Sequence, residues 1–235
     1  MKIKRVLLKL SGESLMGNQE KGISPERIDQ YVNDIVQIHK QGIQTGIVIG
    51  GGNIFRGLSG VSSGFDRVTG DQMGMLATII NSLAFRSALE NAGIKSTLFT
   101  AVEMPAIGKL FHAKTVISEL EKGHIAILAG GTGNPYFSTD TASALRGLEI
   151  KADVFLKGTR VDGVYSDDPE KNPDAVRYTS LSFAEAWDKK LNIMDLTAFT
   201  MCQENNLPVI VFDMNKKSEL VNIISNPKFG TLIHN

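Results

Sequence analysis

The chain has 235 residues, of which 25 are Lys or Arg and 25 are Asp or Glu, so its formal net charge near pH 7 is zero. This balance argues against a surface built for bulk binding of nucleic acid or anionic membranes and leaves a local basic pocket open. The single cysteine, Cys202, excludes an intrachain disulfide and a thiolate metal cluster. No apolar run approaches the roughly 18 residues of a membrane helix. We therefore expect a soluble, cytoplasmic protein with no membrane or nucleic-acid partner, in which Cys202 is a small buried residue.

Short apolar strands alternate with longer amphipathic helices along the chain. In chain order, the pattern predicts a strand over 6–10, a helix from Pro25 to Gly42, a strand over 46–49, a helix over 66–91, a strand over 96–100, a helix over 113–121, a strand over 125–129, a helix over 139–150, and strands over 154–157 and 209–212. This alternation predicts an α/β fold with a mostly parallel sheet flanked by helices, and ligands at the carboxyl ends of the strands. The irregular stretch 158–178 is interpreted as a functional loop.

The first two strands end in glycine-rich turns. Lys9 lies late in the first strand and precedes the turn Ser11-Gly12. Its ammonium is costly to bury unless it meets an anion; the alternative is a lysine that reaches solvent at the end of the sheet. After the second strand come Gly50-Gly51-Gly52 and then Arg56. These glycines let backbone N–H groups converge on an oxyanion, to which Arg56 can add a charged fork; the alternative is only a tight strand–helix turn.

A third glycine-rich exit, residues 129–140, leads from a strand into a helix that begins near Ser138. A helix N-terminus attracts anions, and Thr132 and Asn134 offer uncharged partners for a polar ring or a ribose. Asp140 either caps this helix or serves the site, and the sequence favours neither role.

Other common site types do not fit. The chain has no G-x-x-x-x-G-K-[ST] loop and no G-x-G-x-x-G turn between a strand and a helix, and its four histidines lack metal-ligand spacing. What remains is a set of anion-binding turns, a lysine, an arginine and an acidic loop over 160–169. Such a set suits phosphoryl transfer between two bound anions, which depends on charge neutralisation and in-line positioning.

Several motifs resemble the signatures of the amino acid kinase superfamily: Lys9-Leu10-Ser11-Gly12, Gly50-Gly51-Gly52-Asn53, and the acidic loop from Val161 to Pro169. Two longer motifs, over 67–78 and 131–140, resemble the bacterial uridylate kinases within it, and the segments 194–200 and 230–233 also fit. The resemblance covers essentially the whole chain. It implies a three-layer αβα sandwich, with a single domain over 1–235, an acceptor half over about 1–150 and an ATP half over about 151–235, assembled as a homohexamer.

The resemblance also implies a reaction and a set of site residues. The reaction is transfer of the γ-phosphoryl group of Mg-ATP to UMP, giving UDP and ADP for pyrimidine nucleotide biosynthesis, with Mg²⁺ held mainly by the ATP phosphates. The implied catalytic residues are Lys9, which would bridge the two phosphates, Arg56, Lys157 and Asp195. The implied ATP-binding residues are Lys9, Leu10, Ser11, Gly12, Gly52, Arg56, Thr159, Tyr165 and Asp168. The implied UMP-binding residues are Gly51, Asp71 (to the ribose), Thr132, Gly133, Asn134, Pro135, Tyr136, Phe137, Ser138 and Thr139.

Regulation and two alternative functions stay open. UTP inhibition and GTP regulation occur in the family, but Glu20 and Lys21 stand where proteobacterial members carry a Gly-aromatic pair in the region of GTP activation. One alternative is a sister kinase that phosphorylates a carboxylate or carbamate, whose amino-acid acceptor needs charged partners for its α-amino group. The other is a non-catalytic nucleotide sensor, which needs no lysine between donor and acceptor.

Overall fold

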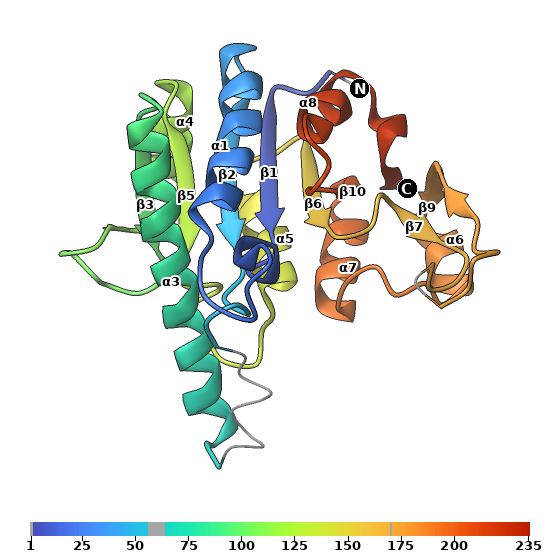
Figure 1. The fold of residues 1–235 in the computed structure, drawn as a ribbon, viewed down its shortest axis with the longest axis horizontal. Helices are drawn as coiled ribbons and strands as arrows, with labels where there is room; N and C mark the ends of the chain where they lie inside the picture. Colours follow the sequence, from blue (N-terminus) through green and yellow to red (C-terminus); the bar gives the residue numbers. More distant parts are fainter. Residues whose placement is uncertain (1, 56–63, 170) are drawn as a thin grey trace.

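The computed structural model describes residues 2–55, 64–169 and 171–235. Within them, one sheet has nine strands in the order β4-β3-β5-β2-β1-β6-β10-β11-β9, and a separate two-stranded sheet pairs β7 with β8 (Figure 1). The strands are β1 (Arg5–Leu10), β2 (Gln44–Ile49), β3 (Ser96–Thr100), β4 (Lys109–Leu110), β5 (Ile125–Ala129), β6 (Val154–Thr159), β7 (Val164–Tyr165), β8 (Arg177–Tyr178), β9 (Ser180–Ser182), β10 (Val209–Asp213) and β11 (Thr231–His234).

Strand β1 lies at the middle of the large sheet, between β2 and β6, and is parallel to both. The chain builds one half of the sheet from β2 to β5 and then crosses to the other half at β6, so the strand order reverses at β1. In open α/β sheets a reversal of this kind leaves a crevice at the carboxyl ends of the strands, where ligands bind. The one antiparallel pair in this sheet, within the described residues, joins β10 to β11.

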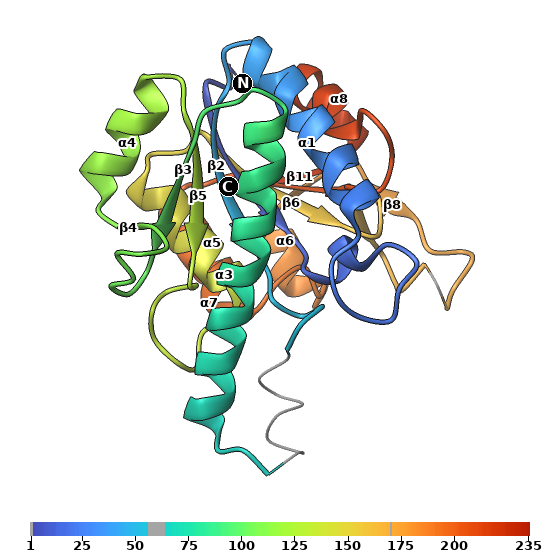
Figure 2. The same cartoon turned by 60° about the vertical axis from the view of Figure 1, so that its left-hand side comes forward.

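Helices cover both faces of the sheet, giving three layers (Figure 2). On one face, α1 (Pro25–Lys40), α3 (Arg67–Asn91) and α8 (Glu219–Ser225) share a buried apolar core with the strands. On the other face, a second core joins the strands to α4 (Ala113–Glu121), α5 (Thr139–Glu149), α6 (Phe183–Asp188) and α7 (Leu196–Glu204). Short 3₁₀ helices cover Glu13–Met16 and Pro227–Phe229. The arrangement is the expected αβα sandwich.

The long helices begin at side chains that cap them. Ser24 accepts a hydrogen bond from the backbone N–H of Arg27 at 3.3 Å, with Pro25 as the first helical residue of α1. Asp66 accepts from the N–H groups of Val68 and Thr69 at the start of α3. Helix α3 has 25 residues, and its N-terminal part extends well past the carboxyl ends of the strands (Figures 1 and 2). No helix in the described ranges is both long and apolar enough to span a membrane.

Every strand and helix predicted from the sequence is present, with ends within two residues of those expected. Cys202 is fully buried, as expected. The stretch 158–178, interpreted from the sequence as a functional loop, differs from that expectation because it contains regular structure. It includes the end of β6 and the β7–β8 hairpin. The sequence also gave no sign of β4, β9, β11 or helices α6, α7 and α8. Most of these elements lie at sheet edges or are very short, so their apolar periodicity has too few residues to be recognised.

Candidate active site

Two lysines and an aspartate meet at the carboxyl ends of β1 and β6. Lys9 on β1 and Lys157 on β6 are register partners on parallel strands, so both side chains project on the same face of the sheet. Asp140, in the first turn of α5, reaches both: its Oδ1 lies 3.1 Å from Lys9 Nζ, and its Oδ2 accepts a hydrogen bond from Lys157 Nζ. The side chains of Lys9, Lys157 and Asp140 are 12%, 11% and 15% exposed.

Charge holds this cluster together in a largely dry environment. Burial raises the pKa of Asp140, but the ammonium groups of Lys9 and Lys157 outweigh burial and leave the pKa below its usual value. Burial also lowers the pKa of the Lys157 ammonium, an effect that the Asp140 carboxylate opposes. With both lysines protonated, the three side chains formally carry one surplus positive charge. A further anion, such as a phosphoryl group, would be stabilised beside them.

The structure decides between the alternatives that the sequence left open for two of these residues. Lys9 does not reach solvent at the end of the sheet, because its ammonium is buried against Asp140. Asp140 does not cap α5. The cap is Ser138, whose Oγ accepts from the backbone N–H groups of Asp140 and Thr141 at 3.0 and 3.1 Å. Asp140 is therefore free to serve the lysines.

The turns after β1 and β2 pack backbone against backbone. A Cβ atom at Gly12 would lie 2.6 Å from the carbonyl oxygen of Gly50, and one at Gly51 would lie 2.8 Å from a carbonyl oxygen of α3. Neither position has room for a side chain, so close packing is one reason for these glycines. Asn81 of α3 donates to the carbonyl oxygen of Gly50 at 2.7 Å and fixes the second turn. Arg56, expected beside it, lies outside the described residues.

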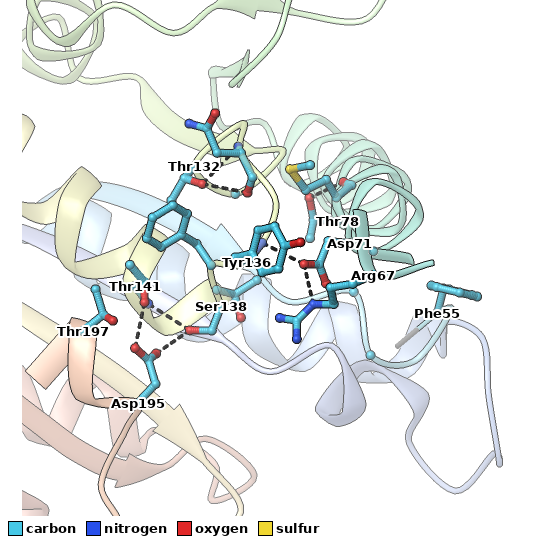
Figure 3. A pocket seen from close by; sticks show the side chains of 18 of the residues that line it. Phe55, Arg67, Asp71, Thr78, Thr132, Tyr136, Ser138, Thr141, Asp195 and Thr197 are labelled. Carbon is cyan, nitrogen blue, oxygen red and sulfur yellow. Dashed lines mark hydrogen bonds and ion pairs between the residues drawn. The ribbon is translucent and has the colours of Figure 1, made fainter. Parts of the chain in front are cut away.

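A cavity of about 610 Å³ lies where the turn after β2 meets α3, the loop after β5 and the start of α7; we call it the first cavity (Figure 3). Its volume is within the range of small-molecule sites in proteins. Hydroxyl, amide and glycine backbone groups line much of it. The lining residues are Gly51, Gly52, Phe55, Arg67, Asp71, Gly74, Met75, Thr78, Gly131, Thr132, Asn134, Tyr136, Phe137, Ser138, Thr139, Thr141, Asp195, Leu196 and Thr197.

The loop after β5 forms one wall of the first cavity and contains several left-handed residues. Gly130, Gly131 and Gly133 have φ values of 81°, 61° and 85°. Residues with a Cβ atom rarely adopt such angles, which accounts for the glycines. Tyr136 has a φ of 73° although it carries a side chain. Its backbone N–H donates to Oδ2 of Asp71 at 2.7 Å, so α3 holds the loop at this point.

Asp195 joins α5 to α7 at the edge of the first cavity. It caps α7 by accepting from the backbone N–H of Ala198 at 3.0 Å. The same carboxylate accepts from the hydroxyl of Thr141 at 2.8 Å and from the hydroxyl of Ser138 (Figure 3). These contacts make Asp195 a link between the two helix N-termini.

A second cavity, of about 460 Å³, is lined by the β7–β8 hairpin region and by residues 189–193. At its wall, Tyr165 donates its hydroxyl hydrogen to Oδ1 of Asp162 at 2.6 Å, and Lys216 Nζ lies 3.0 Å from Oδ2 of the same carboxylate. Burial raises the pKa of Asp162, but these two partners outweigh it and the net pKa is lowered. Thr159 donates to the carbonyl oxygen of Val161 at 2.7 Å, which closes the turn after β6.

The lysine–aspartate cluster has neighbours in the walls of both cavities. Asp140 stands between Thr139 and Thr141, which both line the first cavity. Lys157 is the register partner of Val211, which lines the second cavity. The two ammonium groups are therefore adjacent, in sequence or in strand register, to the walls of both cavities.

The structure distributes the site residues expected from the sequence over these three places. Those lining the first cavity are Gly51, Gly52, Asp71, Thr132, Asn134, Tyr136, Phe137, Ser138, Thr139 and Asp195. Those lining the second are Thr159, Tyr165 and Asp168. Those lining neither are Lys9, Leu10, Ser11, Gly12, Gly133, Pro135 and Lys157. The side chain of Leu10 is fully buried in the core, so only its backbone could contact a ligand.

Sequence reasoning missed several residues of the site. Asp140 was left undecided, and no role was assigned to Arg67, Met75, Thr78 or Thr141. Helical spacing could have found three of them. Positions 67, 75 and 78 are separated from Asp71 by four, four and seven residues, and so share one face of α3 with it. Asp140 has no such pattern, because its partners lie on two distant strands.

Comparison with known proteins connects this geometry to a family. A family model described as "Amino acid kinase family" matches residues 4–213. A protein of Bacteroides thetaiotaomicron named "Uridylate kinase" is 57% identical over 234 residues, which cover 100% of this chain and 99% of that protein. A protein of Parabacteroides distasonis with the same name is 56% identical over 232 residues, which cover 99% of this chain and 98% of the relative.

Solved structures give the same result for the fold. The crystal structure of a UMP kinase from Bacillus anthracis matches with a TM-score of 0.96 and 34% identity, covering 100% of this chain and 97% of the other. That of a UMP kinase from Ureaplasma parvum matches with a TM-score of 0.94 and 35% identity, covering 100% of both chains.

Proposed function

The chain belongs to the amino acid kinase family, and we propose that within it this protein is a nucleoside monophosphate kinase that transfers the γ-phosphoryl group of ATP to UMP. The products are UDP and ADP, which places the reaction in pyrimidine nucleotide biosynthesis. Relatives named uridylate kinase, at 56–57% identity over nearly the full length of both chains, support this choice of acceptor.

The observation that carries the proposal is the buried cluster of Lys9, Lys157 and Asp140 at the carboxyl ends of β1 and β6, next to residues that line two ligand-sized cavities. In phosphoryl transfer an oxygen of the acceptor phosphate bonds to the γ-phosphorus while the bond to the ADP oxygen breaks. Negative charge spreads over the transferring group, and two buried ammonium groups at this point stabilise it. The acceptor phosphate is already ionised at neutral pH, so no general base is needed.

The chemistry of the first cavity favours a nucleotide over an amino acid as the acceptor. Among the described residues its charged side chains are Arg67, Asp71 and Asp195. Arg67 and Asp71 form an ion pair with each other, and Asp195 is occupied by hydrogen bonds from two hydroxyls and a backbone N–H. The side chains of Thr139, Thr197 and Asn134 also line this cavity, and their hydroxyl and amide groups suit the carbonyl and N–H groups of uracil.

Asp140 has the role of orienting the two lysines. Its carboxylate contacts both ammonium groups at once, and removing it would leave two like charges facing each other in a buried site. Lys9 is assigned to the bridge between donor and acceptor phosphates, and Asp195 to holding the N-termini of α5 and α7. Arg56 is assigned to the same phosphates on the resemblance alone.

The chain's own residues fit a metal that arrives with ATP. Within the part of the chain that the structure describes, no group of three or more His, Cys, Asp or Glu side chains could hold a metal ion. Asp195, the acid nearest the start of α7, already has three donors. Mg²⁺ would therefore be held mainly by the ATP phosphates, where it supplies charge neutralisation.

The proposal extends to assembly, location and regulation. We assign the first cavity to UMP and the second to ATP, which largely follows an acceptor half over 1–150 and an ATP half over 151–235. Asp195, Leu196 and Thr197 cross this division, because they line the first cavity. The family resemblance implies a cytoplasmic homohexamer that UTP inhibits and GTP regulates. Sedimentation in the presence of each nucleotide tests the state of assembly.

The test is ADP release from Mg-ATP by the purified protein with UMP, CMP, glutamate or carbamate as the acceptor. A rate with UMP well above the others supports the proposal. Activity only with glutamate or carbamate would keep the fold and the ATP site but overturn the acceptor assignment. No turnover with any of the four, together with measurable UMP binding, would support a nucleotide sensor instead.

A further inference from the structure

We propose that Arg67, Asp71 and Tyr136 form a latch that sets the position of the loop over residues 130–138, which we call the acceptor loop. In this proposal Arg67 and Tyr136 are positioning residues for acceptor binding, and the two oxygens of Asp71 have separate tasks. The latch itself is a property of the ligand-free fold; its consequence for UMP affinity rests on the proposed function.

The latch centres on one oxygen atom. Oδ2 of Asp71 accepts a hydrogen bond from Arg67 Nε at 2.7 Å and another from the backbone N–H of Tyr136, also at 2.7 Å (Figure 3). Arg67 and Asp71 are one helical turn apart on α3, whereas Tyr136 is 65 residues away along the chain. A charge-assisted contact of this length fixes the loop to the helix at a single point.

The backbone of Tyr136 explains why such a contact is needed. Its φ of 73° is in the left-handed region, which a residue with a Cβ atom adopts only where the surroundings favour it. Three glycines earlier in the same loop adopt left-handed angles without strain. The bond to Asp71 is formed by the N–H group of the strained residue itself, so it acts directly on the conformation that requires stabilising.

A second contact joins the same residues through their side chains. The guanidinium carbon of Arg67 lies 5.3 Å from the centroid of the Tyr136 ring, within the range of a cation–π interaction. The ring is otherwise largely exposed, at 65%. Tyr136 is thus held from both ends, its N–H by Asp71 and its ring by Arg67.

The other oxygen of Asp71 is left for the acceptor. Within the described residues, no hydrogen bond or ion pair is recorded for Oδ1, and Asp71 lines the first cavity. A carboxylate oxygen in that position can accept a hydrogen bond from a sugar hydroxyl. Because Oδ2 carries the latch, ligand binding and loop position share one side chain.

The latch controls a large part of the cavity wall. Asn134, Phe137 and Ser138 lie within two residues of Tyr136, and all three line the first cavity. Ser138 also caps α5, the helix that carries Asp140. Release of Tyr136 would therefore displace groups that contact the acceptor before it displaced the lysines. We expect the effect on acceptor affinity, with little effect on the donor.

The first test measures amide hydrogen exchange of the acceptor loop without any nucleotide. Arg67→Met removes both the ion pair and the cation–π contact, and exchange in peptides covering 131–138 is expected to become about fivefold faster. Gln72→Met is the matched control, because residue 72 is an exposed neighbour on α3 with no recorded contact to the loop. Unchanged exchange in Arg67→Met, or equal acceleration in the control, would overturn the latch.

The second test is steady-state kinetics on a double-mutant cycle. Arg67→Met and Tyr136→Leu should each raise KM for UMP about fivefold while KM for ATP stays within about twofold. The double variant should have the same KM for UMP as Arg67→Met alone, because Arg67→Met already removes the cation–π contact that Tyr136→Leu removes. Arg67→Lys, which keeps the charge but not the planar group, should recover only part of the affinity. Additive effects, or equal rises in both KM values, would contradict the proposal.

The two tests separate this inference from the proposed function. If the protein phosphorylates some acceptor other than UMP, the function fails, but the exchange experiment still measures the latch. If turnover with UMP is normal and loop exchange does not respond to Arg67→Met, the latch fails and the function stands.

Discussion

The walls of the two cavities are held together in different ways. In the first cavity the hydrogen bonds join distant parts of the chain: Tyr136 to Asp71 across 65 residues, and Ser138 to Asp195 across 57. In the second cavity many bonds are local, as between Tyr165 and Asp162, which are three residues apart, and two contacts, from Val164 to Thr231 and from Lys216 to Asp162, tie this region to the C-terminal part of the chain. The shape of the first cavity thus depends mainly on contacts between distant segments, whereas the second combines a local hairpin with these two ties.

This difference indicates where selectivity resides. A wall fixed by long-range contacts is already in place before ligand binding, so it can discriminate between acceptors without reorganisation. A wall made from a hairpin with two-residue strands has fewer contacts to the core and opens at lower free energy. Substitutions in the first cavity should therefore change both acceptor affinity and overall stability. Substitutions in the second should change donor affinity alone.

The largest expected effect belongs to neither wall. Lys9→Ala should lower kcat by about 10²–10³-fold and change KM for UMP much less, because the ammonium acts mainly on charge that develops in the transition state. Steady-state kinetics with a direct measurement of UMP binding checks this, with Lys4→Ala at the exposed start of the same chain segment as the control. Unchanged turnover would remove Lys9 from the transfer step.

A smaller effect should separate the first wall from the second. Asp71→Asn should raise KM for UMP about tenfold and lower the free energy of unfolding by about 1 kcal/mol, because it weakens a ligand contact and the bond to Tyr136 together. Titration with both nucleotides and thermal unfolding are the measurements, with exposed Glu90→Gln on the same helix as the control. A selective rise in KM for ATP would mean that Asp71 contacts ATP and that its assignment to UMP is wrong.

The corresponding change at the second wall should be weaker and local. Asp162→Asn loses the contacts to Tyr165 and Lys216, and KM for ATP should rise about threefold with no measurable change in Tm. Asp174→Asn, at an exposed position beyond the cavity, is the control. If Asp162→Asn lowered global stability as much as Asp71→Asn does, the contrast between the two walls would be wrong.

The smallest expected effect is the loss of local stability of the β7–β8 hairpin at acidic pH. The pKa of Asp162 is lowered in the folded protein, so its contribution to stability is present above the ordinary value near 3.8 and is lost as the pH falls through the folded value. As the pH falls below about 4, the wild-type hairpin should lose local stability, and Asp162→Asn should lose less. Amide exchange of peptides over 162–178 measures this; identical pH profiles would contradict it.

How much of the site could be predicted depended on whether its contacts were local. The glycine-rich turns after β1, β2 and β5 were predicted because the residues that determine a turn are consecutive in the sequence. The partner of Lys9 was not, because Asp140 reaches it from a helix 131 positions along the chain and is two residues from the true cap, Ser138. The left-handed backbone of Tyr136 was equally hidden, because the bond that stabilises it comes from α3.

The fold followed the same division. The buried strands and long capped helices carry enough periodic residues to be predicted nearly to their ends. The two-residue strands of the β7–β8 hairpin do not, and the stretch 158–178 was therefore interpreted as loop. Helix α7 is an exception: it was missed although its cap, Asp195, accepts from the N–H of Ala198 only three residues along the chain, a local signal that the sequence contains.

The most direct test of the account is a crystal structure with UMP and a non-hydrolysable ATP analogue bound together. The account predicts uridine in the first cavity, adenine in the second, and the γ-phosphate beside Lys9 and Lys157, with the UMP phosphate oxygen in line with it. Both nucleotides in one cavity, or a γ-phosphate out of reach of the two ammonium groups, would contradict the assignment of this cluster as the point of transfer.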